Sequence, residues 1–243
     1  MTYCLAIRTE TGIVFASDSR TNAGVDHIST YSKMNIFKLP GRLFVILSAG
    51  NLATTQAVIN RVQRDLEEPE SALSLATVKH IHDAAKYIGK INVQAQTEHA
   101  NPLERHGISA ECSFILGGQI EGGTHDIQLI YPQGNSISAS SSTPYLQIGE
   151  IKYGKPILDR VLTAQTTLED AARCALVSLD STMRSNISVG PPVELSIYRK
   201  DALEIAQHLS LENDSPEYVA IKDAWGCGLQ QAFDQLPRFV WEG

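Results

Sequence analysis

Thr2 directly follows Met1 and opens an apolar run that continues to Ile7. Removal of Met1 would leave a hydroxyl and a free α-amine on the same residue. An α-amine with an ordinary pKa of about 7.7–8.0 can accept a hydroxyl proton near neutral pH, so Thr2 would carry both a nucleophile and its base. Many proteins begin with Met-Thr and have no such chemistry. The case for Thr2 therefore depends on what the rest of the chain places around it.

The first strands predict where the other polar groups near Thr2 lie. Residues 2–8 and 12–18 both alternate apolar and polar side chains around a turn at 10–12, a pattern typical of a β-hairpin. Asp18 ends the second strand. A further strand pair is predicted at 33–38 and 43–48, with Lys33 at its start and Ser48 and Gly50 near its end.

The rest of the chain predicts two more groups of strands and two pairs of helices. We expect helices at about 51–66, 71–95, 153–165, 168–185 and 216–236, and strands at 112–120, 126–131, 136–142 and 193–199. The polar stretch 97–107 is interpreted as an exposed loop. Because strands and helices do not alternate as βαβ units, the order predicts an α+β fold of four αββα layers, with two antiparallel sheets between helix pairs.

The composition restricts the class of protein. The 243 residues are 43% hydrophobic, which suits one soluble domain over 1–243 with a carboxyl-terminal helical extension. A net charge of −7 without a long basic run argues against nucleic acid or a membrane as partner, and no secretion signal or spanning segment is recognised. We expect a cytoplasmic protein.

No cofactor or metal is expected. The chain has no CxxC, HExxH, phosphate-loop or GxSxG motif, and we interpret the pair His80 and His82 as solvated. We expect the scattered cysteines to be mostly reduced: Cys4, Cys112, Cys174 and Cys227.

Taken in order, these features resemble the proteasome β-subunit family. The resemblance depends on Thr2, the run from Gly12 to Arg20, the downstream Lys33, and Gly50 at a strand-to-helix junction. The start of the chain and the segment 19–26 are most similar to the bacterial ancestral β-subunit type. The resemblance implies an amino-terminal-nucleophile (Ntn) hydrolase fold and a threonine peptidase that acts on peptides or unfolded proteins.

The resemblance also implies a role for each matching residue. Thr2 would be the nucleophile, Lys33 would lower the barrier to its deprotonation, and Asp18 would pair with Lys33. The Gly50 N–H would donate to the oxyanion. Three residues would support the site: Arg20 by shaping a loop, and Thr21 and Ser48 by lining the substrate pocket.

Two positions depart from the family pattern. Glu150 stands where the family has a serine after the glycine, and a carboxylate there would raise the pKa of the Thr2 amine. Asp180 matches the family's distal aspartate, but Met183 replaces the serine three residues later, for which Ser181, Ser185 and Ser188 are candidate substitutes.

Three functions stay open at this point. The first is a self-assembling threonine peptidase, whose copies would form stacked rings or an open spiral. The second is a catalytically weak or silent structural homo-oligomer of the same fold, and the third is an amidase acting on a non-peptide or isopeptide amide. The sequence leaves a cooperating ATPase partner open, and it makes the carboxyl-terminal helix and residues 97–107 candidates for subunit contacts.

Overall fold

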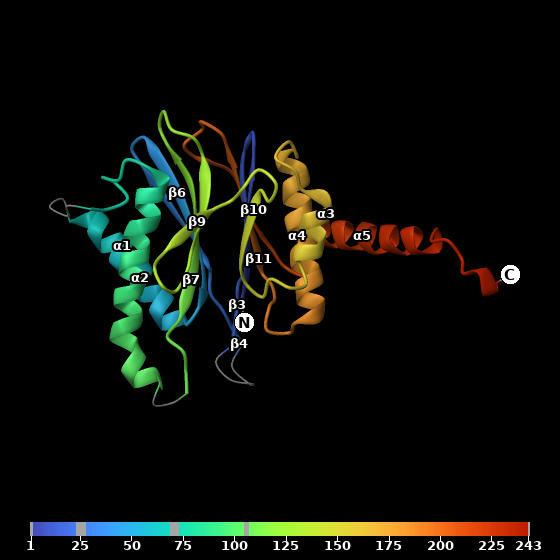
Figure 1. Cartoon of the computed structure of the whole chain (residues 1–243), viewed down its shortest axis with the longest axis horizontal. Coiled ribbons are helices and arrows are strands. Elements are labelled where there is room, and N and C mark those ends of the chain that lie inside the picture. The colour runs from blue at the N-terminus through green and yellow to red at the C-terminus, as the bar shows by residue number, and fades with distance from the viewer. Residues whose placement is uncertain (1, 23–27, 69–72, 105–106, 243) are drawn as a thin grey trace.

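The computed structural model describes residues 2–22, 28–68, 73–104 and 107–242. Two five-stranded antiparallel sheets lie face to face at its centre, and a pair of helices covers the outer side of each sheet (Figure 1). The predicted four-layer αββα arrangement is confirmed. A short antiparallel pair, β3 (Arg20–Asn22) and β4 (Ile28–Thr30), lies apart from both sheets.

The first sheet carries the amino terminus. Its strands follow the order β10, β1, β2, β11, β12. They span Tyr145–Gly149, Tyr3–Thr9, Gly12–Asp18, Val193–Arg199 and Ile205–Leu211 in that order. Within the sheet, Tyr3 pairs with Gly149 on one side of β1, and Cys4 pairs with Ser17 on the other. This register places Thr2 beside the end of β10 and close to the end of β2, where Asp18 lies.

The second sheet supplies the opposite wall of the site. Its order is β5, β6, β7, β8, β9, over Met34–Leu39, Arg42–Gly50, Cys112–Ile120, Asp126–Ile130 and Ser136–Ser138. β6 pairs with both β5 and β7 along its length. Its residues from Leu43 to Ala49 are all buried, as expected for a strand covered on both faces.

Three apolar clusters fill the spaces between the four layers. One lies between the sheets and includes Phe15 and Leu47. The second packs the second sheet against α1 (Leu52–Glu67) and α2 (Ile81–Glu104). The third packs the first sheet against α3 (Lys155–Val161) and α4 (Leu168–Ser185). Burial on both faces explains why β2 is buried at every residue although its sequence alternates.

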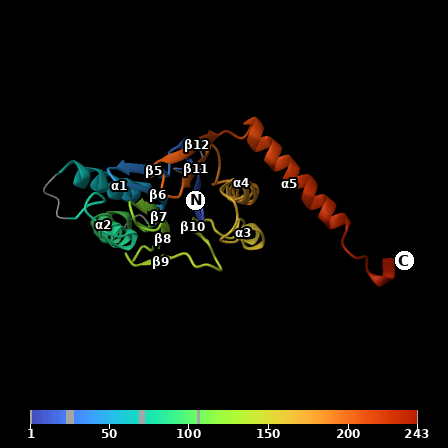
Figure 2. The ribbon, with the colours of Figure 1, turned by 90° about the horizontal axis from the view of Figure 1, so that it is seen from above.

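A fifth helix leaves this body. α5 (Pro216–Asp234) begins beside α4 and projects away from the layers, and the view from above in Figure 2 shows the same separation. A short 3-10 helix, η1 (Val240–Glu242), follows it. Among the described residues, no helix is both long and apolar enough to cross a membrane.

Several predicted boundaries were wrong. The helix predicted at 71–95 is α2, which begins ten residues later and extends to Glu104, so 97–104 is helical rather than an exposed loop. A tertiary contact overrides the polar composition there, because the His99 ring hydrogen-bonds with Thr54 of α1. Within α2, the Thr97 hydroxyl also donates to the Val93 carbonyl oxygen one turn earlier.

Other errors concern short elements. α3 covers only part of the predicted 153–165 helix, and β9 ends at Ser138 rather than at 142. The strands β3, β4, β10 and β12 were not predicted. β12 is mostly exposed along its length, and β10 has only five residues, so neither carries a strong apolar signal.

Candidate active site

The centre of the site is a buried ion pair. Lys33 Nζ lies 2.6 Å from Asp18 Oδ1 and also donates to the Arg20 carbonyl oxygen at 2.7 Å. Asp18 is fully buried and accepts two backbone hydrogen bonds, from Tyr3 N at 3.0 Å and from Gly190 N at 3.2 Å. The same carboxylate oxygen therefore holds both the lysine ammonium and the residue that follows Thr2.

Thr2 is fixed from the other side by the end of β10. Its carbonyl oxygen accepts a hydrogen bond from Glu150 N at 2.7 Å. Gly149 has a φ of +83°, and a Cβ there would lie 1.9 Å from the Thr2 carbonyl oxygen. Only glycine fits this position, because it combines a left-handed backbone with direct contact to the Thr2 main chain.

A cavity of about 430 Å³ opens beside these groups. Six of the predicted site residues line it: Thr2, Arg20, Thr21, Lys33, Ser48 and Gly50. The remaining wall comes from the end of β6, the start of α1 and the end of β10, through Ala49, Asn51, Leu52, Thr55 and Gly149. Asp18 does not line the cavity and reaches it only through Lys33. The structure thus brings together residues from five separate parts of the sequence.

Gly50 lies where β6 turns into α1. Its φ is +119°, and a Cβ there would lie 2.3 Å from the Glu111 carbonyl oxygen. Asn51 follows as the N-cap of α1, with its side-chain oxygen accepting from Thr54 N. At this tight junction Gly50 lines the cavity.

Ser48 and Thr21 give the cavity a polar lining. Ser48 is almost fully buried, and its backbone N–H donates to the Lys33 carbonyl oxygen at 3.0 Å. Thr21 lies in β3, the strand whose first residue accepts from Lys33. Both hydroxyl side chains therefore belong to chain segments whose backbone hydrogen-bonds with Lys33.

Arg20 does not continue β2, which ends at Asp18. Its guanidinium packs against Gly190, where a Cβ would come within 2.3 Å, and donates to the Ile187 carbonyl oxygen at 2.7 Å. Arg20 N also donates to Gly190 O at 3.2 Å. These contacts hold the loop after α4, and with it the Gly190 N–H that binds Asp18.

Glu150 and Asp180 are not among the residues that line the cavity. The buried Glu150 carboxylate accepts from Asn186 Nδ2 at 3.0 Å. Asp180 forms an ion pair with Arg184 one turn further along α4, at 2.8 Å. Of the substitute serines, Ser188 donates its backbone N–H to Asn186 Oδ1. Both predicted relay carboxylates therefore bind other side chains.

Burial dominates the electrostatics of the ion pair. Burial raises the pKa of the Asp18 carboxyl above its ordinary value, while the Lys33 ammonium and the two backbone donors act against that rise. Burial also raises the pKa of the Cys4 thiol, which lies beneath the site and donates to the Ser48 carbonyl oxygen. Cys4 is thus a buried, protonated neighbour of the pair.

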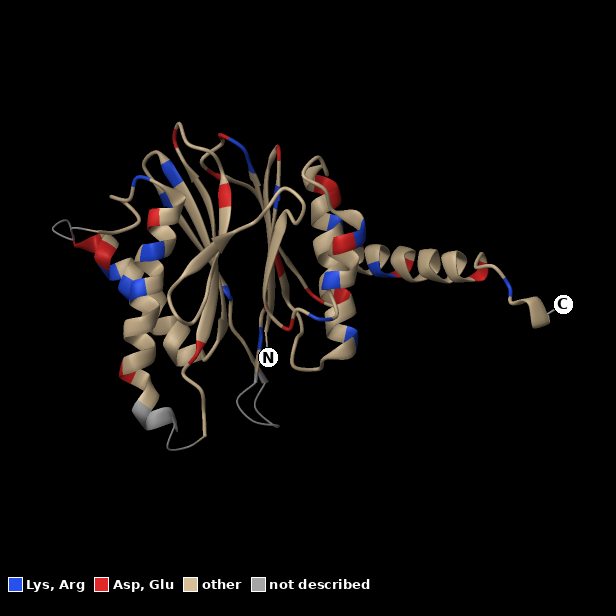
Figure 3. Cartoon of the chain, in the orientation of Figure 1, with Lys and Arg blue, Asp and Glu red and all other residues tan. Residues whose placement is uncertain are grey.

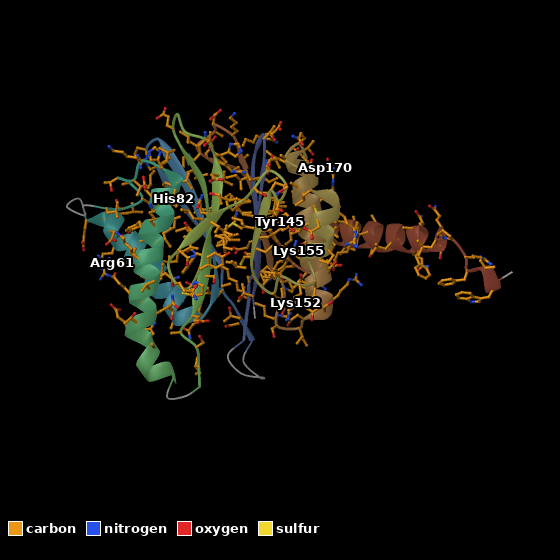
Figure 4. The ribbon with its side chains drawn as sticks, in the orientation of Figure 1. Arg61, His82, Tyr145, Lys152, Lys155 and Asp170 are labelled. Atoms are coloured by element: carbon orange, nitrogen blue, oxygen red, sulfur yellow. The ribbon has the colours of Figure 1, made fainter. Side chains whose placement is uncertain are left out.

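The described residues contain no group of three histidine, cysteine or acidic side chains that could hold a metal ion. His80 and His82 are exposed, and Figure 4 shows His82 on α2, at the far side of the second sheet from α3 and α4. All four cysteines are free.

Sequence reasoning missed several residues of the site. The backbone N–H groups of Gly190 and Tyr3 donate to Asp18. A main-chain donor cannot be recognised from the residue type that carries it. Leu52 and Thr55 reach the cavity because α1 begins there. Asn51 carried a usable signal, since an asparagine before an apolar-periodic run is a common N-cap.

Comparisons with known proteins agree with this arrangement. A family model described as "Proteasome subunit" matches residues 2–198. Anbu (ancestral beta-subunit) from Yersinia bercovieri is 47% identical, with a TM-score of 0.90 and 98% of each chain covered. A comparison with curated protein sequences found no match.

Two further solved structures are similar over almost the whole chain. One is described as the helical assembly of the Anbu complex from Pseudomonas aeruginosa, at 46% identity, a TM-score of 0.91 and 98% coverage of both chains. The other is an Anbu mutant from Hyphomicrobium sp. strain MC1, at 41% identity, a TM-score of 0.91, and 98% and 99% coverage. With its proteasome-like Ntn fold, the chain belongs to the proteasome subunit family.

Proposed function

We propose that this chain is a self-assembling threonine hydrolase that cleaves peptide bonds with Thr2 as its amino-terminal nucleophile. Met1, which lies outside the described residues, must first be removed. One observation carries the proposal: Thr2 and Lys33 face the same cavity, and Asp18 holds both Lys33 and the backbone after Thr2. Residues 1–243 would act as one domain with α5 as an extension.

The first step would be acyl transfer to Thr2. The hydroxyl attacks the peptide carbonyl while the α-amine accepts its proton, and the Lys33 ammonium stabilises the developing alkoxide. The resulting oxyanion would accept a hydrogen bond from the Gly50 N–H. A donor of this kind lowers the activation barrier by about 2.7–4 kcal/mol. The α-ammonium then returns its proton to the leaving amine, which leaves an ester on Thr2.

The second step would be hydrolysis of that ester. Water attacks with the α-amine again as base, and the Thr2 hydroxyl leaves with the proton. Asp18 would keep Lys33 charged and in place throughout, since a buried ammonium without a counter-charge tends to lose its proton.

The cavity supports a peptide substrate whose residue before the cleaved bond is accommodated between Thr21 and Ser48. Charged side chains in its lining are cationic, from Arg20 and Lys33, and Lys33 is already paired. Because like charges repel, we expect polar rather than cationic side chains at that position. We place the enzyme in the cytoplasm, as a homo-oligomer in a ring stack or spiral.

The test compares wild-type chain with Thr2→Ala and Thr2→Ser. A panel of fluorogenic peptides is incubated with each purified chain. Wild type should cleave at least one peptide, Thr2→Ser should retain part of that rate, and Thr2→Ala should have none. Equal rates in all three chains would rule out Thr2 as nucleophile.

A second function is favoured by the contacts of Glu150 and Asp180. Both carboxylates bind other side chains, Asn186 and Arg184. This observation supports a structural oligomer that keeps the fold but does not turn over substrate. It predicts a chain that assembles normally, with Thr2→Ala indistinguishable from wild type. An amidase for non-peptide or isopeptide amides would instead cleave such substrates in a screen in which the peptides stay intact.

A further inference from the structure

Removal of Met1 would leave Thr2 attached to the chain by a single peptide bond. A terminal residue of this kind is poorly ordered unless other groups hold it. The Thr2 carbonyl oxygen is held by Glu150 N at 2.7 Å, and this bond fixes only one end of the residue. The direction of the Thr2 side chain therefore depends strongly on how firmly the next residue, Tyr3, is held.

Tyr3 begins β1, and alternation along this strand separates its side chain from that of Thr2. Successive side chains in a strand point to opposite faces of the sheet. Tyr3 packs in the apolar cluster between the first sheet and α4, whereas Cys4 packs in the cluster between the two sheets. Thr2 lines the cavity together with Ser48 of the second sheet. Thr2 and Cys4 thus share the inner side, opposite the Tyr3 ring.

The Tyr3 hydroxyl is held by side chains from two other elements. It lies 2.7 Å from Ser178 Oγ of α4 and accepts a hydrogen bond from Gln147 Nε2 of β10 at 2.5 Å. Tyr3 and Ser178 are both fully buried. Figure 3 shows most charged residues on the helices and near the ends of strands, and both of these partners are neutral. The hydroxyl therefore ties β1 to α4 and to β10 without a charge.

Gly154, the residue before α3, closes the space around the same hydroxyl. A Cβ at Gly154 would lie 2.4 Å from the Tyr3 hydroxyl oxygen and 2.2 Å from Ser178 Oγ. The φ of Gly154 is −83°, which any residue can adopt, so glycine is needed here for space and not for its backbone. Because this wall is so close, the far end of the Tyr3 ring has little room to move.

The main chain of Tyr3 is fixed as well. Tyr3 N donates to Asp18 Oδ1 at 3.0 Å, so the carboxylate at the centre of the site holds the backbone while α4 holds the ring. Gln147 and Glu150 lie three residues apart at the end of β10. This one segment therefore binds both the Tyr3 hydroxyl and the Thr2 carbonyl oxygen.

We infer that Tyr3 is a positioning residue for the reaction of Thr2, and that the contacts of its hydroxyl with Ser178 and Gln147 keep the Thr2 side chain directed into the cavity. The inference rests on the proposed function and deepens it. Tyr3 is not among the residues that line the cavity, so it acts on Thr2 through the backbone. Misplacement of a reacting group by about 1 Å can lower a rate about 100-fold.

A second buried tyrosine of the same sheet separates this role from ordinary packing. Buried tyrosine hydroxyls usually have a hydrogen-bond partner, which alone would explain the partners of Tyr3. Tyr198 is also fully buried, and its hydroxyl donates to Gln119 Oε1 at 2.5 Å. It pairs with Ile13, at the far end of β2 from the site. Loss of either hydroxyl should cost similar stability, but only Tyr3 adjoins the proposed nucleophile.

The kinetics of adduct formation on Thr2 test the inference, with full-length chain freed of Met1 and a peptide epoxyketone as the probe. Mass spectrometry gives the maximal rate, the half-saturating probe concentration and the final adduct per chain. Tyr3→Phe should lower the maximal rate about 10- to 100-fold, change the half-saturating concentration less than about twofold, and still react completely. A purely structural loss would instead reduce the final amount of adduct and leave the rate of the folded molecules unchanged.

Tyr198→Phe is the matched control. It should lower the urea midpoint of unfolding about as much as Tyr3→Phe does and keep the wild-type maximal rate. Ser178→Ala should slow the reaction, and its combination with Tyr3→Phe should be no slower than Tyr3→Phe alone, because both changes remove one contact. A wild-type maximal rate in Tyr3→Phe, or an equal loss of rate in Tyr3→Phe and Tyr198→Phe, would overturn the inference.

The pH profile adds a readout that distinguishes Tyr3 from a titrating group. Burial raises the pKa of the Tyr3 hydroxyl, so this group stays protonated throughout the range in which an α-amine titrates. Tyr3→Phe should therefore lower the rate at every pH and leave the acid limb in place. A displaced acid limb would contradict a role in positioning alone.

Hydrogen exchange separates a failure of the anchor from a failure of the proposed chemistry. The amides of Tyr3 and Glu150 donate to Asp18 and to the Thr2 carbonyl oxygen. Both should exchange about 10-fold faster in Tyr3→Phe, and at the wild-type rate in Tyr198→Phe. A wild-type chain that forms no adduct, with this change in exchange, would refute the chemistry and support the anchor. Unchanged exchange in Tyr3→Phe would overturn the anchor, whether or not Thr2 reacts.

Discussion

The Lys33 ammonium lies 2.6 Å from the Asp18 carboxylate, and the two side chains are 6% and 0% exposed. Asp18 also accepts the backbone N–H of Tyr3 at 3.0 Å. The carboxylate therefore links the lysine to the residue that follows the proposed nucleophile. Removal of either charge would affect both folding and chemistry, and the two effects can be separated.

Single substitutions of this pair should destabilise the fold. Lys33→Met leaves a buried carboxylate without its counter-charge, and Asp18→Asn leaves a buried ammonium, each at a cost of about 3–5 kcal/mol. The double variant removes both charges and should recover much of that stability. Urea unfolding of the four chains measures the cycle.

Activity should not follow the same cycle. The double variant lacks the ammonium that stabilises the alkoxide, so its adduct formation on Thr2 should be as slow as that of Lys33→Met. Restored reactivity in the double variant would mean that the pair only supports the fold.

Gly149→Ala should displace Thr2. A Cβ at 149 would lie 1.9 Å from the Thr2 carbonyl oxygen, so the strand end must move, at a cost of about 1–3 kcal/mol beyond backbone strain. Gly122→Ala is a matched control, because its φ of +75° resembles the +83° of Gly149 and nothing lies within 4 Å of the added Cβ. We expect the control to show strain of about 1–2 kcal/mol and an intact Thr2 reaction. Equal loss of Thr2 reactivity in both would refute this account of Gly149.

Glu150→Gln should shift the pH dependence of the Thr2 reaction. The carboxylate belongs to the residue whose N–H holds Thr2, and a nearby negative charge stabilises the ammonium form of the Thr2 amine. Its removal should lower the pKa of that amine, so the acid limb of the rate profile moves to lower pH by a few tenths to one unit. Asn186→Ala removes the hydrogen-bond partner of Glu150 without removing the charge, and it should leave the limb nearer to wild type. A shift to higher pH in Glu150→Gln would contradict the assignment.

The places in the fold of three candidate site residues were predictable because each stands where an element ends, and the resemblance to the proteasome β-subunit family implied their roles. Asp18 ends β2, Lys33 precedes β5, and Gly50 ends β6, so apolar runs in the sequence located all three. What could not be predicted is made by the main chain, such as the Gly190 N–H on Asp18. Backbone donors depend on the course of a loop and not on residue type.

The elements of the fold also divide into those with a strong sequence signal, which were predicted, and those without one, which were missed. Long buried strands such as β6 and the helices α1 and α4 have strong periodicity and were predicted within a few residues. β12 was missed because it lies at a sheet edge with most of its residues exposed. The end of α2 was predicted wrongly because its polar last turns are held by contacts with α1, such as that of His99 with Thr54.

Thiol reactivity should distinguish one cysteine from the others. Burial raises the pKa of Cys112 and Cys174 to about 12 and raises that of Cys4 as well, so their thiols stay protonated and covered at pH 8. Cys227 is exposed. Native chain should react with one equivalent of a thiol reagent within minutes, and unfolded chain with four. Rapid reaction of a second thiol in the native state would contradict the described packing.

The mass of the amino-terminal peptide tests the central claim most directly. Purified chain is treated with a peptide electrophile that closes a ring through both a hydroxyl and an amine on one residue, and the digested peptide is weighed by mass spectrometry. The account predicts a peptide that begins at Thr2 and carries one adduct, which is absent in Thr2→Ala. A peptide that retains Met1 and carries no adduct would contradict it.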